Sequence, residues 1–190
     1  MNKQTIRDED RQILLELARR SIEAATRQRS LPQIHLADYS PDLQSEGASF
    51  VTLTIQGVLR GCIGTLEAYQ PLVKDVVEHA AAAATEDFRF MPVSPSEVKL
   101  ISIEVSILTP PDKLEYVSMD DLLSKLIPGE SGVILKDGHR RATFLPQVWE
   151  QLPEKEEFLS HLCSKMGAAP NLWKTKNLEV FTYQVEEFHE

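Results

Sequence analysis

Apolar residues recur with two different periods along this chain, and the change of period separates helices from strands. Residues 5–30 carry apolar side chains at three- and four-residue spacing, which is typical of a long amphipathic helix. These apolar positions are Ile13, Leu14, Leu17, Ala18, Ile22 and Ala25. Arg27 and Arg29 stand near the end of this segment, where cations complement the helix dipole. Nucleic-acid binding is the alternative role for the two arginines.

Alternation of apolar and polar residues predicts strands. Residues 49–56 alternate in this way, and Gly57 permits a turn into a second strand that begins at Val58. We expect these two strands to form an antiparallel hairpin. Residues 99–111 alternate again and predict a third strand, with Leu100 outside its buried phase.

Between these strands the spacing is helical over residues 71–88. Pro71 suits the first position of the helix. The alanine run over residues 80–84 would let this helix approach its neighbour closely. Residues 31–48 are rich in Pro, Asp, Ser and Gly and predict a connector.

Shorter elements fill the second half of the chain. They are a helix over 119–126 capped by Ser118, a hairpin over 131–146 that turns at Asp137 and Gly138, helices over 145–152 and 153–167, and a strand over 177–188. Most strands are joined by hairpins or by segregated helices, without regular strand–helix–strand units. The predicted fold class is therefore α+β, an antiparallel sheet flanked by helices.

Composition is that of an ordinary globular protein of the cell interior. Apolar residues make up 42% and charged residues 26% of the 190 residues. Two cysteines form no disulfide framework and suit a reducing compartment. The N-terminal segment lacks the apolar run of a signal peptide, and no stretch has the length of a membrane span. We expect a cytoplasmic protein.

The net charge of -9 disfavours extended contact with nucleic acid, because a negative field repels phosphate backbones. A local basic patch can still bind a small anion. The histidines and cysteines have no metal-ligand spacing, so we predict neither a metal nor a cofactor. His79 lies one turn from Asp75, a spacing that usually marks an exposed, solvated pair.

One stretch, LRGCIGT at residues 59–65, has a chemically suggestive pattern. On a strand, Arg60, Cys62 and Gly64 share one face. A guanidinium group beside a thiol favours the thiolate form. Gly61 and Gly64 would let a ligand or another backbone approach the sulfur closely. The alternative is that Cys62 is a small buried filler and that the glycines mark a bulge.

This stretch and four others, in the expected order, resemble the AMMECR family. The four are EDFRFMPVSPSEV, ISIEVSILTPP, the run that begins GVILKDGHRRATFLPQVW, and the terminal NLEVFTYQVEEF. The resemblance covers about residues 10–188. Within it, TFLPQVW resembles the bacterial form, which is the A protein of the AmmeMemoRadiSam system.

The resemblance implies a fold and a set of partners but no established reaction. The implied fold is α+β with two unequal lobes and a cleft between them. The larger lobe would hold residues 1–108 and 171–190, and the smaller lobe residues 109–170. The implied partners are a MEMO-like protein and a radical S-adenosylmethionine protein.

The resemblance also implies a set of site residues. Carried over by motif, these are Arg60, Gly61, Cys62, Gly64, Arg89, Arg141 and Thr143. If the three arginines converge they form an anion site, because guanidinium forks match carboxylate and phosphate. The alternative is three separate arginines paired with acids such as Glu67 and Asp87. Many relatives carry proline where this chain has Phe88 and Met91, so the turn around Arg89 should be looser here.

Three functions remain open. The first is an accessory or binding protein whose inter-lobe cleft, floored by residues 59–65, holds a small anion or a segment of a partner. The second is a thiol-dependent enzyme with Cys62 as nucleophile and Arg60 as its activator. The third, a nucleic-acid-associated regulator, is disfavoured by the charge. Binding is the favoured hypothesis because a nucleophile needs a base, for which His79 and His139 are the only candidates.

Overall fold

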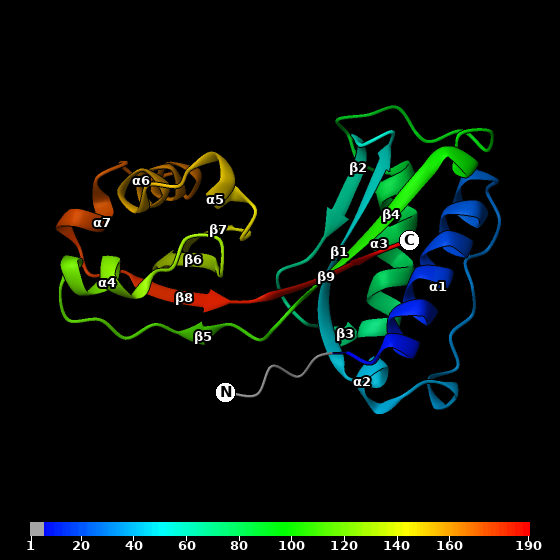
Figure 1. The fold of residues 1–190 in the computed structure, drawn as a ribbon, viewed down its shortest axis with the longest axis horizontal. Coiled ribbons are helices and arrows are strands. Elements are labelled where there is room, and N and C mark those ends of the chain that lie inside the picture. Colours follow the sequence, from blue (N-terminus) through cyan, green and yellow to red (C-terminus); the bar gives the residue numbers. More distant parts are fainter. Residues whose placement is uncertain (1–5) are drawn as a thin grey trace. The chain divides into compact units, whose positions relative to one another are not determined.

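The computed structural model describes residues 6–190, which form two compact units (Figure 1). The first unit comprises the chain up to Leu108 together with Glu186–Glu190, and the second comprises Thr109–Val185. Residues 171–185, which the family resemblance placed with the larger lobe, lie in the second unit. The reason is that strand β8 (Glu179–Tyr183) pairs with two strands of that unit.

An antiparallel sheet forms the centre of the first unit. Its strand order is β2-β1-β4-β9, with the short β3 beside β1. The strands are β1 (Glu46–Ile55), β2 (Val58–Gly64), β3 (Gln70–Pro71), β4 (Ile101–Leu108) and β9 (Val185–His189). The predicted β1–β2 hairpin is confirmed. Its turn residues Gln56 and Gly57 have φ angles of 51° and 77°, as a type I′ turn requires.

Helices α1 (Asp8–Thr26) and α3 (Leu72–Thr85) cover the sheet and share its core. Between α1 and β1 lie a 3-10 turn, η1 (Leu36–Asp38), and the short α2 (Pro41–Gln44), and η2 (Val98–Leu100) precedes β4. Helix α1 is shorter than the predicted 5–30, and Thr5 lies outside the described residues. The expectation that Pro71 begins its helix is wrong. Pro71 is the residue before α3, with an extended ψ of 134°, and it pairs with β1.

Helix α3 approaches β2 most closely at Gly61. A Cβ atom built on Gly61 would stand 2.1 Å from the carbonyl oxygen of Ala83. The alanines on this side of the helix, including Ala80 and Ala84, are buried. The predicted close approach of the alanine run is confirmed, and it explains why position 61 has no side chain.

The second unit contains its own antiparallel sheet, in the order β5-β8-β6-β7. Its remaining elements are β5 (Asp112–Lys113), α4 (Met119–Lys125), β6 (Gly132–Asp137), β7 (Arg140–Phe144), α5 (Val148–Gln151), α6 (Lys155–Lys165) and α7 (Leu172–Thr175). Ser118 caps α4 as predicted, accepting a hydrogen bond from the backbone N–H of Asp121. The hairpin turn lies at Gly138 and His139, one residue later than predicted, because Asp137 pairs with Arg140 in the ladder.

The predicted strand over 177–188 is two strands in two different sheets. Strand β8 belongs to the second unit and β9 to the sheet of the first. Gln184 separates them and exchanges two hydrogen bonds of 2.9 Å with Thr109. Alternation has the same period in every strand, so it cannot show that the chain changes sheets within a run. In both units the fold class is α+β with antiparallel sheets, as predicted.

Candidate functional site

The outer edge of β2 is covered at Cys62 by two side chains from the loop after α3. The backbone N–H of Cys62 donates to Asp87 Oδ2 over 2.8 Å, and Arg89 Nη2 lies 3.3 Å from the Cys62 carbonyl oxygen. Arg89 also donates two side-chain hydrogen bonds to Asp87, from Nε to Oδ1 at 2.9 Å and from Nη2 to Oδ2 at 2.7 Å. The pair thus satisfies an edge strand that would otherwise expose its backbone groups.

Asp87 is buried, and its charged form is strongly favoured. The hydrogen bond from Arg89 lowers the pKa of Asp87 well below its ordinary value of 3.8, against the opposing effect of burial. The N–H of Cys62 lowers that pKa further. The contacts of Asp87 hold Arg89 in place.

Arg60 binds the same loop farther along. Its Nε donates to Glu97 Oε1 over 3.0 Å, and its Nη1 donates to the carbonyl oxygen of Met91 over 2.8 Å. The side chain of Arg60 is only 17% exposed. The hydrogen bond from Arg60, with others from Ser94, lowers the pKa of Glu97 from 4.5 to about 2. Both arginines near the LRGCIGT strand are therefore neutralised by carboxylates of their own unit.

The thiol of Cys62 is half-buried and has a single hydrogen-bond partner within residues 6–190. Thr52, opposite it on β1, donates to the sulfur over 3.3 Å. Neither histidine proposed from the sequence is bonded to the sulfur. His79 is occupied by Asp75 and Ser49, and His139 lies in the hairpin turn of the second unit.

Arg141 and Thr143 lie on β7 and so belong to the second unit, whereas Arg60 and Arg89 belong to the first. Thr143 is buried, and its hydroxyl donates to the carbonyl oxygen of Val133 and lies 3.0 Å from the hydroxyl of Tyr183. Burial raises the pKa of Tyr183 to about 12. The hydroxyl group of Thr143 therefore forms hydrogen bonds inside its own unit.

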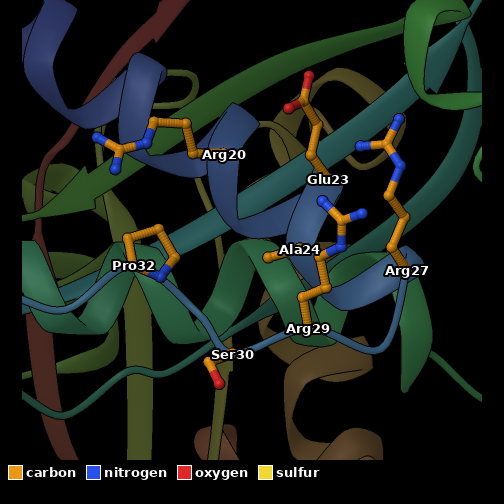
Figure 2. Close-up of a pocket in the computed structure, with 7 residues that line it drawn as sticks. All are labelled: Arg20, Glu23, Ala24, Arg27, Arg29, Ser30 and Pro32. Atoms are coloured by element: carbon orange, nitrogen blue, oxygen red, sulfur yellow. The ribbon is translucent and has the colours of Figure 1, made fainter.

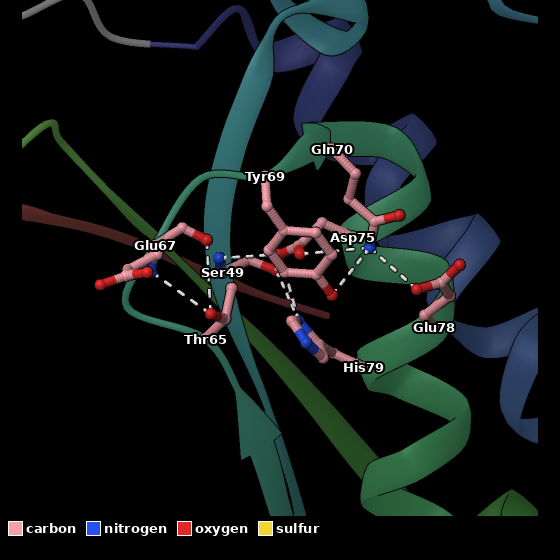
Figure 3. A network of polar contacts seen from close by, with 8 residues as sticks. All are labelled: Ser49, Thr65, Glu67, Tyr69, Gln70, Asp75, Glu78 and His79. Carbon is pink, nitrogen blue, oxygen red and sulfur yellow. Dashed lines mark hydrogen bonds and ion pairs between the residues drawn. The ribbon is translucent and has the colours of Figure 1, made fainter.

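A second polar network, which the sequence did not predict in this form, joins α3 to β1 (Figure 3). Asp75 is fully buried, and its Oδ2 accepts hydrogen bonds from the N–H and hydroxyl of Ser49, at 2.9 and 2.6 Å. His79 Nδ1 lies 3.1 Å from the same oxygen. The pair expected to be solvated is buried instead, because α3 turns this face toward the sheet.

The three residue types of a serine hydrolase meet here, but not in the arrangement that catalysis requires. The hydroxyl of Ser49 lies 3.5 Å from His79 Nδ1, the same nitrogen that faces Asp75. In a catalytic triad the carboxylate and the serine contact opposite nitrogens of the imidazole. Ser49 is also fully buried, out of reach of a substrate. The network holds α3 on the sheet, and Gln70 extends it outward to Tyr69 and Glu78.

Among the described residues, no three His, Cys, Asp or Glu side chains gather as a metal site. No helix of that part of the chain is long and apolar enough to cross a bilayer.

Comparison with known proteins settles the family. The AMMECR1 family model matches residues 15–188. This chain belongs to the AMMECR1 family. A protein of Methanothermobacter thermautotrophicus is 41% identical, with 97% of this chain and 95% of that protein aligned. A protein of Thermococcus gammatolerans is 35% identical, with 97% and 92% aligned.

The family assignment extends to three dimensions. The crystal structure of uncharacterized protein PH0010 from Pyrococcus horikoshii is 34% identical and superposes with a TM-score of 0.85, covering 97% of this chain and 93% of that one. The relatives named here are archaeal. Family membership thus confirms the resemblance carried by the LRGCIGT stretch and the four other motifs.

Proposed function

We propose that this AMMECR1-family protein is an accessory protein that docks a protein partner on one end of its first unit. The observation that carries the proposal is the exposure of Phe88 and Met91, which are 96% and 81% accessible. Large apolar side chains left open to water on one surface are characteristic of interaction sites.

These two residues belong to a larger group on adjoining segments. The apolar end, as we call it, consists of five exposed apolar side chains, those of Val58, Leu59, Phe88, Met91 and Leu100. They lie on the β1–β2 hairpin, on the loop between α3 and β4, and just before β4. The loop passes beside the hairpin, and Arg60 ties the two together through Met91 and Glu97 (Figure 1).

The polar groups of the LRGCIGT strand support this surface from beneath. Arg60 and Arg89 hold the loop at both sides of Met91 and Phe88 by hydrogen bonds to Glu97, Asp87 and backbone carbonyls. A loop held in its bound conformation loses less entropy when a partner docks. In this proposal the arginines organise the surface and do not themselves hold an anion.

The thiol-dependent enzyme has weaker support. A cysteine nucleophile is activated by a neighbouring base or by a cation that favours the thiolate. Cys62 has Thr52 as its hydrogen-bond partner, while Arg60 is committed to Glu97. The family resemblance suggests a MEMO-like protein and a radical S-adenosylmethionine protein as partners, and these are the first to test.

The test uses purified proteins and biolayer interferometry. The double variant Phe88→Ser/Met91→Ser should weaken partner binding at least about tenfold, as loss of apolar anchors does. Val117→Ser is the matched control, because Val117 is 92% exposed in the second unit. Arg60→Gln should weaken binding less, by releasing the loop, and Cys62→Ala should leave it unchanged.

Two results would contradict the proposal. One is that neither candidate partner binds the wild-type chain; the other is that the double variant binds as tightly as the Val117→Ser control. Loss of binding or activity in Cys62→Ala, with the fold intact by circular dichroism, would instead favour the thiol-dependent enzyme.

A further inference from the structure

A hollow at the end of helix α1 is lined by three arginines (Figure 2). The arginine hollow, as we call it, is lined by Arg20, Glu23, Ala24, Arg27, Arg29, Ser30 and Pro32. In Figure 2 the side chains of Glu23, Arg27 and Arg29 point to the same side of the helix end, whereas the guanidinium group of Arg20 and the hydroxyl group of Ser30 point away from them. The hollow lies wholly within the first unit and shares no residue with the apolar end.

Arginines elsewhere in the chain have internal partners. Ion pairs to carboxylates are made by Arg7, Arg11, Arg19, Arg60, Arg89 and Arg140, and Arg141 also has an interaction. Within residues 6–190, Arg20, Arg27 and Arg29 make no ion pair. In a chain with 29 acidic residues, the unneutralised arginines are therefore gathered in one place.

A backbone turn with an unfavourable conformation at Gln28 brings Arg29 back to the end of the helix. Gln28 follows the helix with φ of 54°, a left-handed conformation that usually falls to glycine. The N–H of Arg29 donates to the carbonyl oxygen of Ala24 over 2.9 Å, and that of Gln28 to Ala25 over 3.0 Å. This turn reverses the chain and returns Arg29 to the helix end.

The local charge of the hollow favours an anion. The guanidinium groups of Arg27 and Arg29 against the single carboxylate of Glu23 leave a surplus of 2 − 1 = 1 positive charge. The carbonyl groups at the end of α1 carry partial negative charge and account for only part of this surplus. Guanidinium forks such as those of Arg27 and Arg29 fit phosphoryl oxygens.

We propose that the arginine hollow binds the phosphoryl group of a small phosphorylated molecule. A phosphoryl group presents three acceptor oxygens to the two guanidinium forks, one more than a carboxylate does. Nucleic acid is disfavoured because the net charge of -9 repels an extended polyanion, whereas a small anion meets only the local field.

Inorganic pyrophosphate serves as the probe in a calorimetric titration at low salt. Arg27→Gln/Arg29→Gln should weaken binding at least about tenfold, because two charge-assisted bonds are lost. The matched control is Lys74→Gln/Lys99→Gln, which removes the same charge from the same unit at positions that do not line the hollow. Glu23→Gln should tighten binding about twofold to threefold, since it removes the one anion in the hollow.

A second readout needs no variant. In the wild-type chain, pyrophosphate should shift the backbone amide resonances of residues 20–32 and leave those around Cys62 in place. Absence of saturation into the millimolar range, or equal weakening by the lysine control, would overturn the proposal. So would shifts confined to other residues, or a short duplex DNA that competes better than pyrophosphate.

Discussion

The LRGCIGT strand and the end of helix α1 both carry arginines, but the fold treats them in opposite ways. Arg60 and Arg89 are tied to Glu97 and Asp87, and they brace the loop that covers the edge of β2. Arg27 and Arg29 protrude beyond the helix without a carboxylate partner among the described residues. The arginines near the LRGCIGT motif are therefore neutralised within the protein. The arginines at the end of α1, which carry no recognised motif, can still pair with a ligand.

This contrast shows that an arginine in a motif need not mark an anion site. A cation that is half-buried must be compensated, so the fold supplies a carboxylate and makes the pair part of the structure. A cation in water needs no such partner. The first arrangement should therefore govern stability, and the second should govern ligand binding with little effect on stability.

The largest effect on stability should come from Gly61→Ala. This change disturbs the packing of α3 against β2, the strand that carries the ion-paired arginines. A methyl group at this position would meet the carbonyl oxygen of Ala83 at 2.1 Å and push α3 away from β2. We expect a loss of about 3 kcal/mol in the free energy of unfolding, measured by urea denaturation. Gly57→Ala is the control, since it has open space and a φ of 77°. It should cost only about 1 kcal/mol.

The next largest effect should come from Asp87→Asn. This change leaves Arg89 without its counter-charge and weakens the acceptor for the N–H of Cys62. We expect the free energy of unfolding to fall by about 2 kcal/mol. Asp112→Asn, at an exposed position in β5, should change it by less than about 0.5 kcal/mol. Equal effects of the two substitutions would remove the contrast between the regions.

Acid should lower the free energy of unfolding by protonating Glu97, the partner of Arg60. The pKa of Glu97 is lowered from 4.5 to about 2 in the folded chain, so its contribution is complete above pH 4.5 and is lost as pH falls toward 2. The stability difference between the wild type and Glu97→Gln should be constant near neutral pH and shrink over that window. Urea denaturation at a series of pH values measures it, and a pH-independent difference would contradict the role of Glu97.

The smallest effect should come from the arginine hollow. Arg27→Gln/Arg29→Gln should change the free energy of unfolding by less than about 0.5 kcal/mol, because neither side chain has a buried partner to lose. Thermal and urea denaturation without added anion measure this. A loss as large as that of Asp87→Asn would show that these arginines are structural.

Local features of the chain were readable before the fold was known. The β1–β2 hairpin follows from the alternation that Gly57 interrupts, and the Ser118 cap follows from a hydroxyl placed just before a helical run. The exposure of Leu100 follows from its place outside the buried phase of β4. Each of these depends on residues close together in the chain.

Features that depend on distant residues were missed or misplaced. Nothing in the spacing of Asp75 and His79 shows that Ser49 closes on them from β1. Glu97 was not predicted as the partner of Arg60, because the two residues are 37 positions apart. The split of the last strand at Gln184 was invisible for the same reason, since each half has the same alternation.

The sequence by itself therefore determined the fold class, the family and most of the local elements, because periodicity, turn residues and motifs act over short distances. Tertiary structure alone decided which charges are neutralised and which remain free. Helix α3 buries Asp75 against β1, and the loop after it delivers Asp87 and Glu97 to the LRGCIGT strand. The arginines at the end of α1 make no ion pair with any residue that the structure describes. Ionic interactions act through space and depend on burial, so only the folded chain shows which arginine is a brace and which is available to a ligand.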